Sequence, residues 1–125
     1  MKRILVIDDD RQLRLMLDAM LKSAGYEVKA VEDGSLALGA VREFKPDLVI
    51  TDLFMPEKEG LQTITELRRE APKLKIMAIS GGTPLSSMDF LGVAKKMGAQ
   101  KTLAKPFVRQ DLLAAVAELI GDAKA

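Results

Sequence analysis

Residues 47–60 read DLVITDLFMPEKEG. The segment opens with apolar and β-branched residues, Leu48 to Thr51, which are typical of a strand buried on both faces. It stops on a carboxylate, Asp52, and Pro56 and Gly60 follow in a stretch of turn-forming residues. Open α/β sheets build their sites where a strand delivers a polar side chain to its C-terminal end, directly before a loop. Asp52 is therefore a candidate functional residue, and the alternative is that it only caps a turn.

The same alternation of strand and helix recurs along the whole chain. Apolar runs predict strands at residues 3–8, 26–31, 47–52, 74–80 and 101–104. Amphipathic spacing predicts helices between them, beginning with the apolar stripe of Leu13, Met16, Leu17, Met20 and Leu21. Later helices are expected to start at Asp33 or Ser35, near Leu61, at Ser86 or Ser87, and at Val108. Five such alternations favour a parallel sheet, because the crossovers are long enough for parallel pairing.

Local signals also predict the ends and faces of these elements. Gly25 is expected to cap the first helix at its C-terminus, and Pro46 and Pro72 to end the second and third. The weak pattern of residues 26–31 indicates an edge strand. On the third helix, Leu61, Ile64 and Leu67 are expected to face inward, and Glu66, Arg68, Arg69 and Glu70 outward. The methionines are expected to fill core space.

Composition sets limits on the class of protein. With 125 residues and 48% hydrophobic residues, one domain spanning residues 1–125 is expected. The net charge of +1 argues against nucleic-acid binding through bulk charge. The chain has no Cys and no His, so any imidazole chemistry must come from another molecule. No signal peptide and no membrane-spanning run are seen, which predicts a cytoplasmic location.

Polar groups follow four of the predicted strands. The first ends in Asp8, Asp9 and Asp10, the third in Asp52, and the fourth in Ser80, while Lys105 follows the fifth. In a parallel sheet these ends share one edge, where ligands bind at the point of strand-order reversal. Asp10 lies one residue further along and is expected to cap the first helix or act as a first-turn acid.

Three carboxylates in one cleft require compensation. Two unit charges at ~4 Å repel by on the order of 4 kcal/mol at an effective dielectric of 20. Either a carboxylate takes up a proton or a cation binds, and an all-oxygen ligand set favours Mg²⁺, with Mn²⁺ as a substitute. Lys105 and Ser80 are suited to bind an anion opposite the metal. A carboxylate beside a divalent ion, a lysine and a hydroxyl group suits phosphoryl transfer to aspartate.

These motifs together resemble a response-regulator receiver domain of the chemotaxis type. The resemblance covers the whole chain and is carried by residues 7–10, by Asp52 with Met55-Pro56 and Gly60, by Ser80, and by Lys105-Pro106-Phe107. It implies a flavodoxin-like, doubly wound α/β fold with a five-stranded parallel sheet of order 2-1-3-4-5 and five helices. It also implies a protein that catalyses only its own phosphorylation and dephosphorylation.

The resemblance further implies a role for each site residue. Asp52 would accept a phosphoryl group from a histidine kinase or a histidine phosphotransfer protein. Asp9, Asp52 and the carbonyl oxygen of Phe54 would hold Mg²⁺, with Asp8 acting mainly through bound water. Ser80 and Lys105 would bind the phosphoryl oxygens, and the Lys105–Pro106 peptide would be cis. Output would pass through the face formed by the fourth helix, fifth strand and fifth helix, to a target that the sequence does not name.

Two positions depart from the family pattern. Receivers often carry an aromatic residue three positions before the lysine, where this chain has Thr102, so the usual coupling to the strand-four hydroxyl group is in question. Thr102 is alternatively an ordinary β-branched strand residue. Phe54 is expected near the mouth of the site, where it either slows dephosphorylation by shielding the acyl phosphate or has no kinetic role.

The sequence leaves three alternatives to the receiver function open. One is a receiver-like module that binds a partner without phosphorylation. Another is a small Mg²⁺ aspartyl phosphohydrolase, but the position of its general acid is occupied by Phe54. A third is a flavodoxin-like cofactor carrier, which three aspartates after the first strand disfavour. We expect no output domain after Ala125, and we expect the chain to be either a stand-alone regulator or a receiver cut from a longer protein.

Overall fold

The computed structural model describes residues 2–52, 59–80, 98–105 and 107–121, with residues 59–61 and 80 described by their backbone alone. The strands are β1 (Arg3–Ile7), β2 (Glu27–Val31), β3 (Leu48–Asp52), β4 (Lys75–Ser80) and β5 (Lys101–Ala104). The helices are α1 (Arg11–Ser23), α2 (Ala37–Phe44), α3 (Glu59–Glu70) and α5 (Arg109–Ile120), with a short 3₁₀ turn, η1 (Gly34–Leu36). The helix expected from Ser86 or Ser87 lies outside the described residues.

The strands form one parallel sheet in the order β2-β1-β3-β4-β5, as predicted. The weakly patterned β2 is an edge strand, which confirms its predicted place. The register pairs Ile7 of β1 with Thr51 of β3, and Asp52 with Ile79 of β4. The C-terminal ends of the strands therefore lie along one edge of the sheet.

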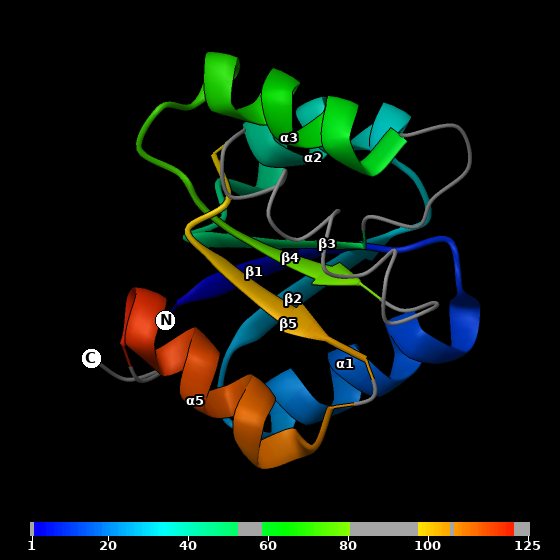
Figure 1. The fold of residues 1–125 in the computed structure, drawn as a ribbon, viewed down its shortest axis with the longest axis vertical. Coiled ribbons are helices and arrows are strands. Elements are labelled where there is room, and N and C mark those ends of the chain that lie inside the picture. The colour runs from blue at the N-terminus through cyan, green and yellow to red at the C-terminus, as the bar shows by residue number, and fades with distance from the viewer. Residues whose placement is uncertain (1, 53–58, 81–97, 106, 122–125) are drawn as a thin grey trace.

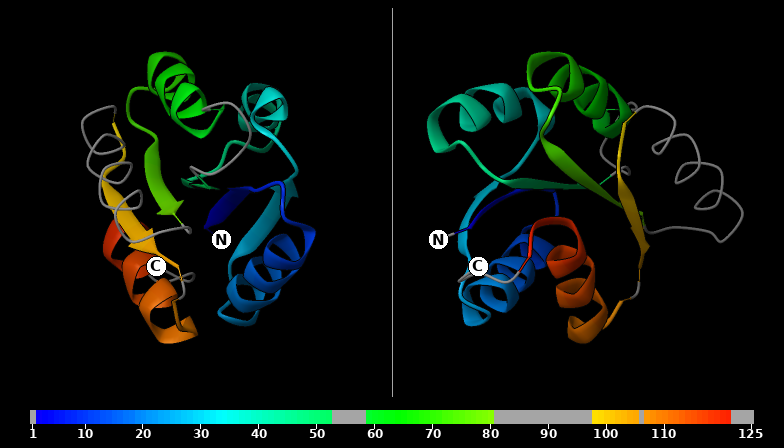
Figure 2. Two further views of the ribbon diagram at one scale, coloured as in Figure 1. Left: turned by 45° about the vertical axis from the view of Figure 1, so that its right-hand side comes forward. Right: turned by 90° about the vertical axis from the view of Figure 1, so that its left-hand side faces the viewer.

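Helices cover both faces of the sheet, so the doubly wound fold is confirmed. Helices α2 and α3 pack on one face and α1 and α5 on the other (Figures 1 and 2). Side chains alternate between the two faces along each strand. In β1, Leu5 and Ile7 face α2 and α3, whereas Ile4 and Val6 face α1 and α5. Both faces are buried, which explains the unbroken apolar runs of the central strands.

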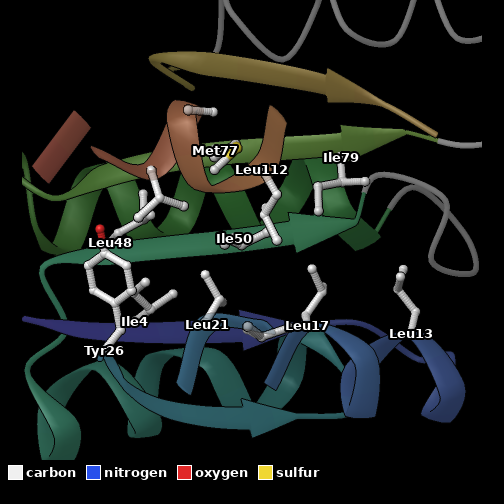
Figure 3. Packing of buried hydrophobic residues seen from close by; sticks show 13 residues of the cluster. Ile4, Leu13, Leu17, Leu21, Tyr26, Leu48, Ile50, Met77, Ile79 and Leu112 are labelled. Atoms are coloured by element: carbon white, nitrogen blue, oxygen red, sulfur yellow. The ribbon is translucent and has the colours of Figure 1, made fainter. Parts of the chain in front are cut away.

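The core between the sheet and helices α1 and α5 is shown in Figure 3. Leu17 and Leu21 of α1 and Leu112 of α5 are fully buried there against Ile50 of β3. Met77 is also fully buried, in agreement with the expected role of methionine as core filler. Met16 departs from that expectation, because its side chain is 38% exposed on the outer face of α1.

Both ends of α1 follow the predicted capping chemistry. Asp10 is the N-cap, and its side chain accepts hydrogen bonds from the backbone N–H groups of Gln12 and Leu13. At the other end, Gly25 has a φ of 99° and donates its N–H to the carbonyl of Lys22. Tyr26 donates its N–H to the carbonyl of Leu21, which completes a Schellman motif. A glycine suits this position because φ is positive.

The second and third helices differ in detail from the predictions. Asp33 caps η1 through Ser35, so the regular helix begins only at Ala37. The helix ends at Phe44, and Lys45 adopts a left-handed conformation before Pro46. Arg68 was expected to face outward, but it is partly buried and its guanidinium hydrogen-bonds to the segments that precede β4 and β5.

Arg68 joins α3 to the segments that lead into β4 and β5. Its Nη1 donates to the carbonyl of Leu74 at 2.7 Å, and its Nη2 donates to the carbonyl of Gly98 at 2.7 Å. Arg68 therefore cross-links the helix to both segments through charge-assisted hydrogen bonds. None of the helices in the described ranges has the length and apolar character needed to cross a membrane.

Candidate functional site

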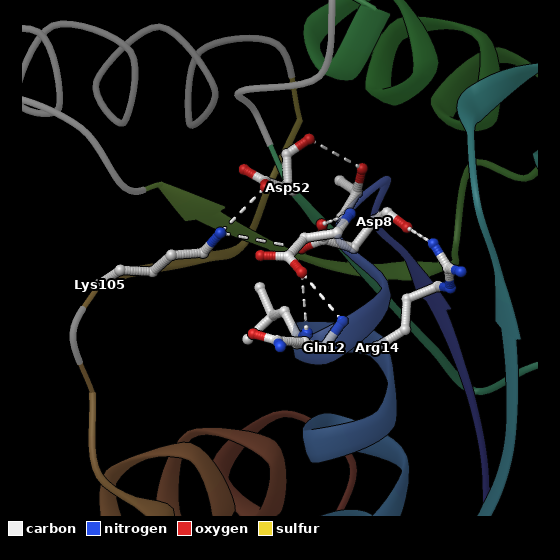
Figure 4. Close-up of polar contacts among 8 residues, drawn as sticks. Asp8, Gln12, Arg14, Asp52 and Lys105 are labelled. Atoms are coloured by element: carbon white, nitrogen blue, oxygen red, sulfur yellow. Dashed lines mark hydrogen bonds and ion pairs between the residues drawn. The ribbon is translucent and has the colours of Figure 1, made fainter.

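Three strands bring charged side chains to the same edge of the sheet. Asp8 directly follows β1, Asp52 is the last residue of β3, and Lys105 directly follows β5. Figure 4 shows the side chains of Asp8, Asp52 and Lys105 converging from these ends. The parallel register explains the convergence, because every strand presents its C-terminal end on this side.

The acidic side chains form a compact cluster. Asp8, Asp9 and Asp52 each offer a carboxylate oxygen, and these oxygens lie within 4.8 Å of one another. Asp8 is 1% exposed and Asp52 is 4% exposed, whereas Asp9 is open to solvent. The cluster therefore has a buried base and one side accessible from outside.

Lys105 provides the positive charge that faces the cluster. Its Nζ lies 3.0 Å from Oδ2 of Asp52, within hydrogen-bond distance, and 3.8 Å from Oδ2 of Asp8. Its own side chain is 25% exposed. The ammonium group partly neutralises two buried carboxylates and lies directly beside the predicted phosphoacceptor.

The turn that carries Asp8 and Asp9 is held at several points. The Asp8 N–H donates to the carbonyl of Val31 at 3.2 Å, which ties the turn to β2. Oδ1 of Asp8 accepts the N–H of Asp10 at 2.8 Å, and Nη1 of Arg14 donates to the Asp8 carbonyl at 2.8 Å. Asp10 points its carboxylate at the start of α1, so its predicted role as N-cap is confirmed.

Burial and charge make Asp8 an unusual acid. The pKa of the Asp8 carboxyl is raised to about 7, chiefly by burial and also by the neighbouring charge of Asp52. The N–H of Asp10 and the ammonium of Lys105 act in the opposite direction, but they do not outweigh the loss of solvation. One carboxylate of the cluster is thus costly to keep ionised without a cation.

The donor set fits a hard divalent cation. Oδ2 of Asp8 is buried and accepts no hydrogen bond from the described residues. Buried carboxylate oxygens without a donor are expensive, and a cation would satisfy this one. Carboxylate oxygens are the ligands that Mg²⁺ prefers, and Mg²⁺ is commonly held by one or two of them. Asp8, Asp9 and Asp52 could therefore hold Mg²⁺.

The structure brings together four of the residues singled out from the sequence: Asp8, Asp9, Asp52 and Lys105. The backbone of Ser80 ends β4 at the same edge, paired with Ala104, while its hydroxyl group lies outside the described part of the chain. Phe54 and the Lys105–Pro106 peptide also lie outside it. Thr102 lies within β5, is partly buried, and pairs with Ala78.

Sequence reasoning missed Arg14. Its hydrogen bond to the Asp8 carbonyl links α1 to the acidic turn, and it depends on the angle at which the helix leaves that turn. The sequence does place this arginine four residues after the predicted N-cap, about one helical turn into the helix. That spacing alone also describes many solvent-exposed arginines.

Comparison with known proteins agrees with this geometry. Residues 4–117 match the family described as the response regulator receiver domain. The chain is 36% identical over 118 residues to the response regulator MprA of Mycolicibacterium vanbaalenii, covering 94% of this chain and 50% of that protein. It is 37% identical over 115 residues to the DNA-binding response regulator MtrA of Mycolicibacterium smegmatis, covering 92% and 49%.

The chain spans about half the length of these curated relatives. Among solved structures, a response regulator receiver domain protein from Clostridium thermocellum has a TM-score of 0.87 and 30% identity to this chain. That match covers 96% of this chain and 94% of the other. A family match over nearly the whole chain and a shared fold lead to one conclusion: the chain belongs to the response-regulator receiver family of two-component signalling.

Proposed function

We propose that this domain accepts a phosphoryl group on Asp52 from the phosphohistidine of a sensor kinase or a histidine phosphotransfer protein. The observation that carries the proposal is the placement of Asp52 between a cluster of carboxylates within 4.8 Å and the Lys105 ammonium at 3.0 Å. A nucleophile between a cation-binding group and a fixed ammonium matches what phosphoryl transfer requires, which is positioning and charge stabilisation.

The proposed transfer is a single displacement at phosphorus. A carboxylate oxygen of Asp52 forms a bond to phosphorus while the bond from phosphorus to the donor imidazole nitrogen breaks. The electron pair of that bond returns to the imidazole, and the product is an acyl phosphate on Asp52. Since this chain has no His, the imidazole belongs to the partner.

The other site residues are assigned by their positions around Asp52. Asp8 and Asp9 would hold Mg²⁺ together with Asp52 and the carbonyl oxygen of Phe54. When bound, the ion supplies positive charge that offsets the carboxylates and the incoming phosphoryl oxygens. Lys105 would exchange its contact with Oδ2 of Asp52 for a phosphoryl oxygen, and the Ser80 hydroxyl would donate to another.

Phosphorylation is proposed to shift an existing equilibrium between two conformations, with readout on the face that includes β5 and α5. In the described residues that face holds Thr102 where an aromatic is common in the family, and an ion pair joins Lys101 to Glu118 at 2.5 Å. The domain would act in the cytoplasm and catalyse only reactions of its own aspartyl phosphate. MtrA is named as a DNA-binding protein, but with its net charge of +1 this domain is proposed to regulate rather than to bind DNA.

The test is phosphorylation of the purified chain by acetyl phosphate with Mg²⁺, followed by intact-mass spectrometry. The expected result is a mass increase of one phosphoryl group that requires Mg²⁺ and is absent from Asp52→Asn. Asp47→Asn is a matched control, because Asp47 directly precedes the N-terminal end of β3, whereas Asp52 lies at its C-terminal end. It should be phosphorylated like the wild type.

The competing proposal is a module that binds its partner without phosphorylation. It would be favoured if the folded wild type gained no mass from acetyl phosphate while still binding its partner. A phosphohydrolase would instead release phosphate from many equivalents of a phosphate monoester. We expect no such turnover, because no general acid is predicted beside Asp52.

A further inference from the structure

Arg14 lies behind the acidic turn and contacts it directly. It is on the first turn of α1, and its Nη1 donates to the carbonyl oxygen of Asp8 at 2.8 Å. Figure 4 shows its guanidinium and the ammonium of Lys105 on opposite sides of Asp8. The two cations differ in their partners, because Lys105 contacts carboxylates whereas Arg14 contacts a backbone carbonyl.

That carbonyl belongs to the peptide that joins Asp8 to Asp9. A peptide unit is planar, so fixing its carbonyl oxygen also fixes the direction in which the chain enters Asp9. The turn is tied to β2 through the Asp8 N–H, and to Asp10 through Oδ1 of Asp8. Arg14 adds a tie from α1 to the peptide between the two carboxylates, and thereby limits how far they can rotate relative to each other.

We propose that Arg14 is a positioning residue for cation binding: it holds the Asp8–Asp9 peptide so that both carboxylates face Asp52. The inference rests on the proposed function, since it assigns Arg14 to the site that would hold Mg²⁺. Groups that orient metal ligands typically affect metal affinity by 10- to 100-fold, even though they do not touch the ion.

A purely electrostatic role for Arg14 predicts the opposite result. A positive charge beside a cation site repels the cation, so removing the charge should strengthen binding. Removing a positioning contact should weaken binding, because the carboxylates must be ordered when the ion arrives. The sign of the change in affinity therefore separates the two roles.

The experiment measures Mn²⁺ binding to the full chain from the electron paramagnetic resonance signal of the free ion. Arg14→Met keeps an apolar stem and removes the donor, and Mn²⁺ should then bind about 10-fold more weakly. Arg14→Lys keeps the charge and one donor and should recover most of the affinity. Arg11→Met is the matched control: Arg11 is an exposed arginine at the start of the same helix, with no hydrogen bond to the turn among the described residues. It should bind Mn²⁺ as tightly as the wild type or slightly more tightly.

Circular dichroism checks that each variant is folded, and Arg14→Gln replaces Arg14→Met if the latter is not. The inference is overturned if the Arg14 variant binds Mn²⁺ as tightly as the wild type or more tightly, or if Arg11→Met loses as much affinity. A wild type that binds Mn²⁺ but gains no mass from acetyl phosphate would contradict the proposed function. The Mn²⁺ affinities of the Arg14 and Arg11 variants would then still decide this inference. A wild type that binds no Mn²⁺ would overturn both.

Discussion

The carboxyl group of Asp8 is buried, and its protonation makes the stability of the fold depend on pH. Its pKa rises from 3.8 to about 7 on folding, chiefly through burial. Between these two values the folded state binds more protons than the unfolded state, so the free energy of unfolding falls as pH rises. The loss begins near pH 4 and is complete above about pH 7.

Asp8→Asn should therefore stabilise the protein in the absence of divalent ions. Asparagine keeps an oxygen for the Asp10 N–H but carries no charge. We expect the free energy of unfolding to rise by about 1–3 kcal/mol at pH 8 and by less at pH 5. Guanidinium unfolding with a chelator, followed by circular dichroism, measures this. Asp111→Asn, at an exposed carboxylate on α5, should give no gain, and an equal gain at both pH values for Asp8→Asn would contradict the argument.

Lys105 should have opposite effects on metal affinity and on phosphorylation. Its ammonium, 3.0 Å from Asp52, repels an incoming cation and partly neutralises the carboxylates. Lys105→Gln should bind Mg²⁺ several-fold more tightly, unfold more easily in a chelator, and be phosphorylated much more slowly by acetyl phosphate. Calorimetric titration gives the affinity. Lys101→Gln, at the other end of β5, should leave Mg²⁺ affinity unchanged, and a weaker affinity in Lys105→Gln would refute the repulsion.

At the scale of the element, α1 is held by a cap at each end. Asp10 accepts two backbone N–H groups, and Gly25 supplies the positive φ of the Schellman motif. Asp10→Ala should lower the free energy of unfolding by about 1 kcal/mol. Gly25→Ala should lower it by about 1–2 kcal/mol, because an L side chain disfavours the left-handed conformation.

Thermal unfolding of both variants tests these values, and Gly39→Ala is the control. Gly39 lies within α2, where an added Cβ meets no atom within 4 Å, so alanine should stabilise that helix slightly. Unchanged stability in Gly25→Ala would mean that the turn after α1 can adopt another conformation.

At the scale of the whole molecule, cation binding should stabilise the entire fold. The three carboxylates come from two different strand ends, and they are gathered only in the folded state. A ligand that binds only the folded state adds about 2.7 kcal/mol at 100 times its dissociation constant. Mg²⁺ should therefore raise the melting temperature with a logarithmic dependence on concentration. Asp9→Asn should lose most of this response, and a full response in that variant would remove Asp9 from the site.

The periodicities that predicted the fold reflect burial on both faces of the sheet. Central strands such as β1 and β3 carry continuous apolar runs, Ile4 to Ile7 and Leu48 to Ile50, because helices cover both faces of the sheet. The helices are apolar on one stripe. These local patterns predicted a parallel sheet with a helix after each strand, whereas the strand order 2-1-3-4-5 was foreseen only through the resemblance to the receiver family. Met16 and Arg68 could not be placed in the same way, because a position on a helical stripe does not say how far the neighbouring elements extend.

The amino-acid order alone determined which chemical groups are available and which strand end carries each of them, because strand direction and alternation are local properties of the chain. Only tertiary packing decided the distances: the contact of Lys105 with Asp52, the burial that makes Asp8 a weak acid, and the reach of Arg14 to the Asp8 carbonyl. These depend on strand register and on the angle at which α1 leaves the sheet. Such quantities arise from contacts between residues far apart in the chain, and no local pattern encodes them.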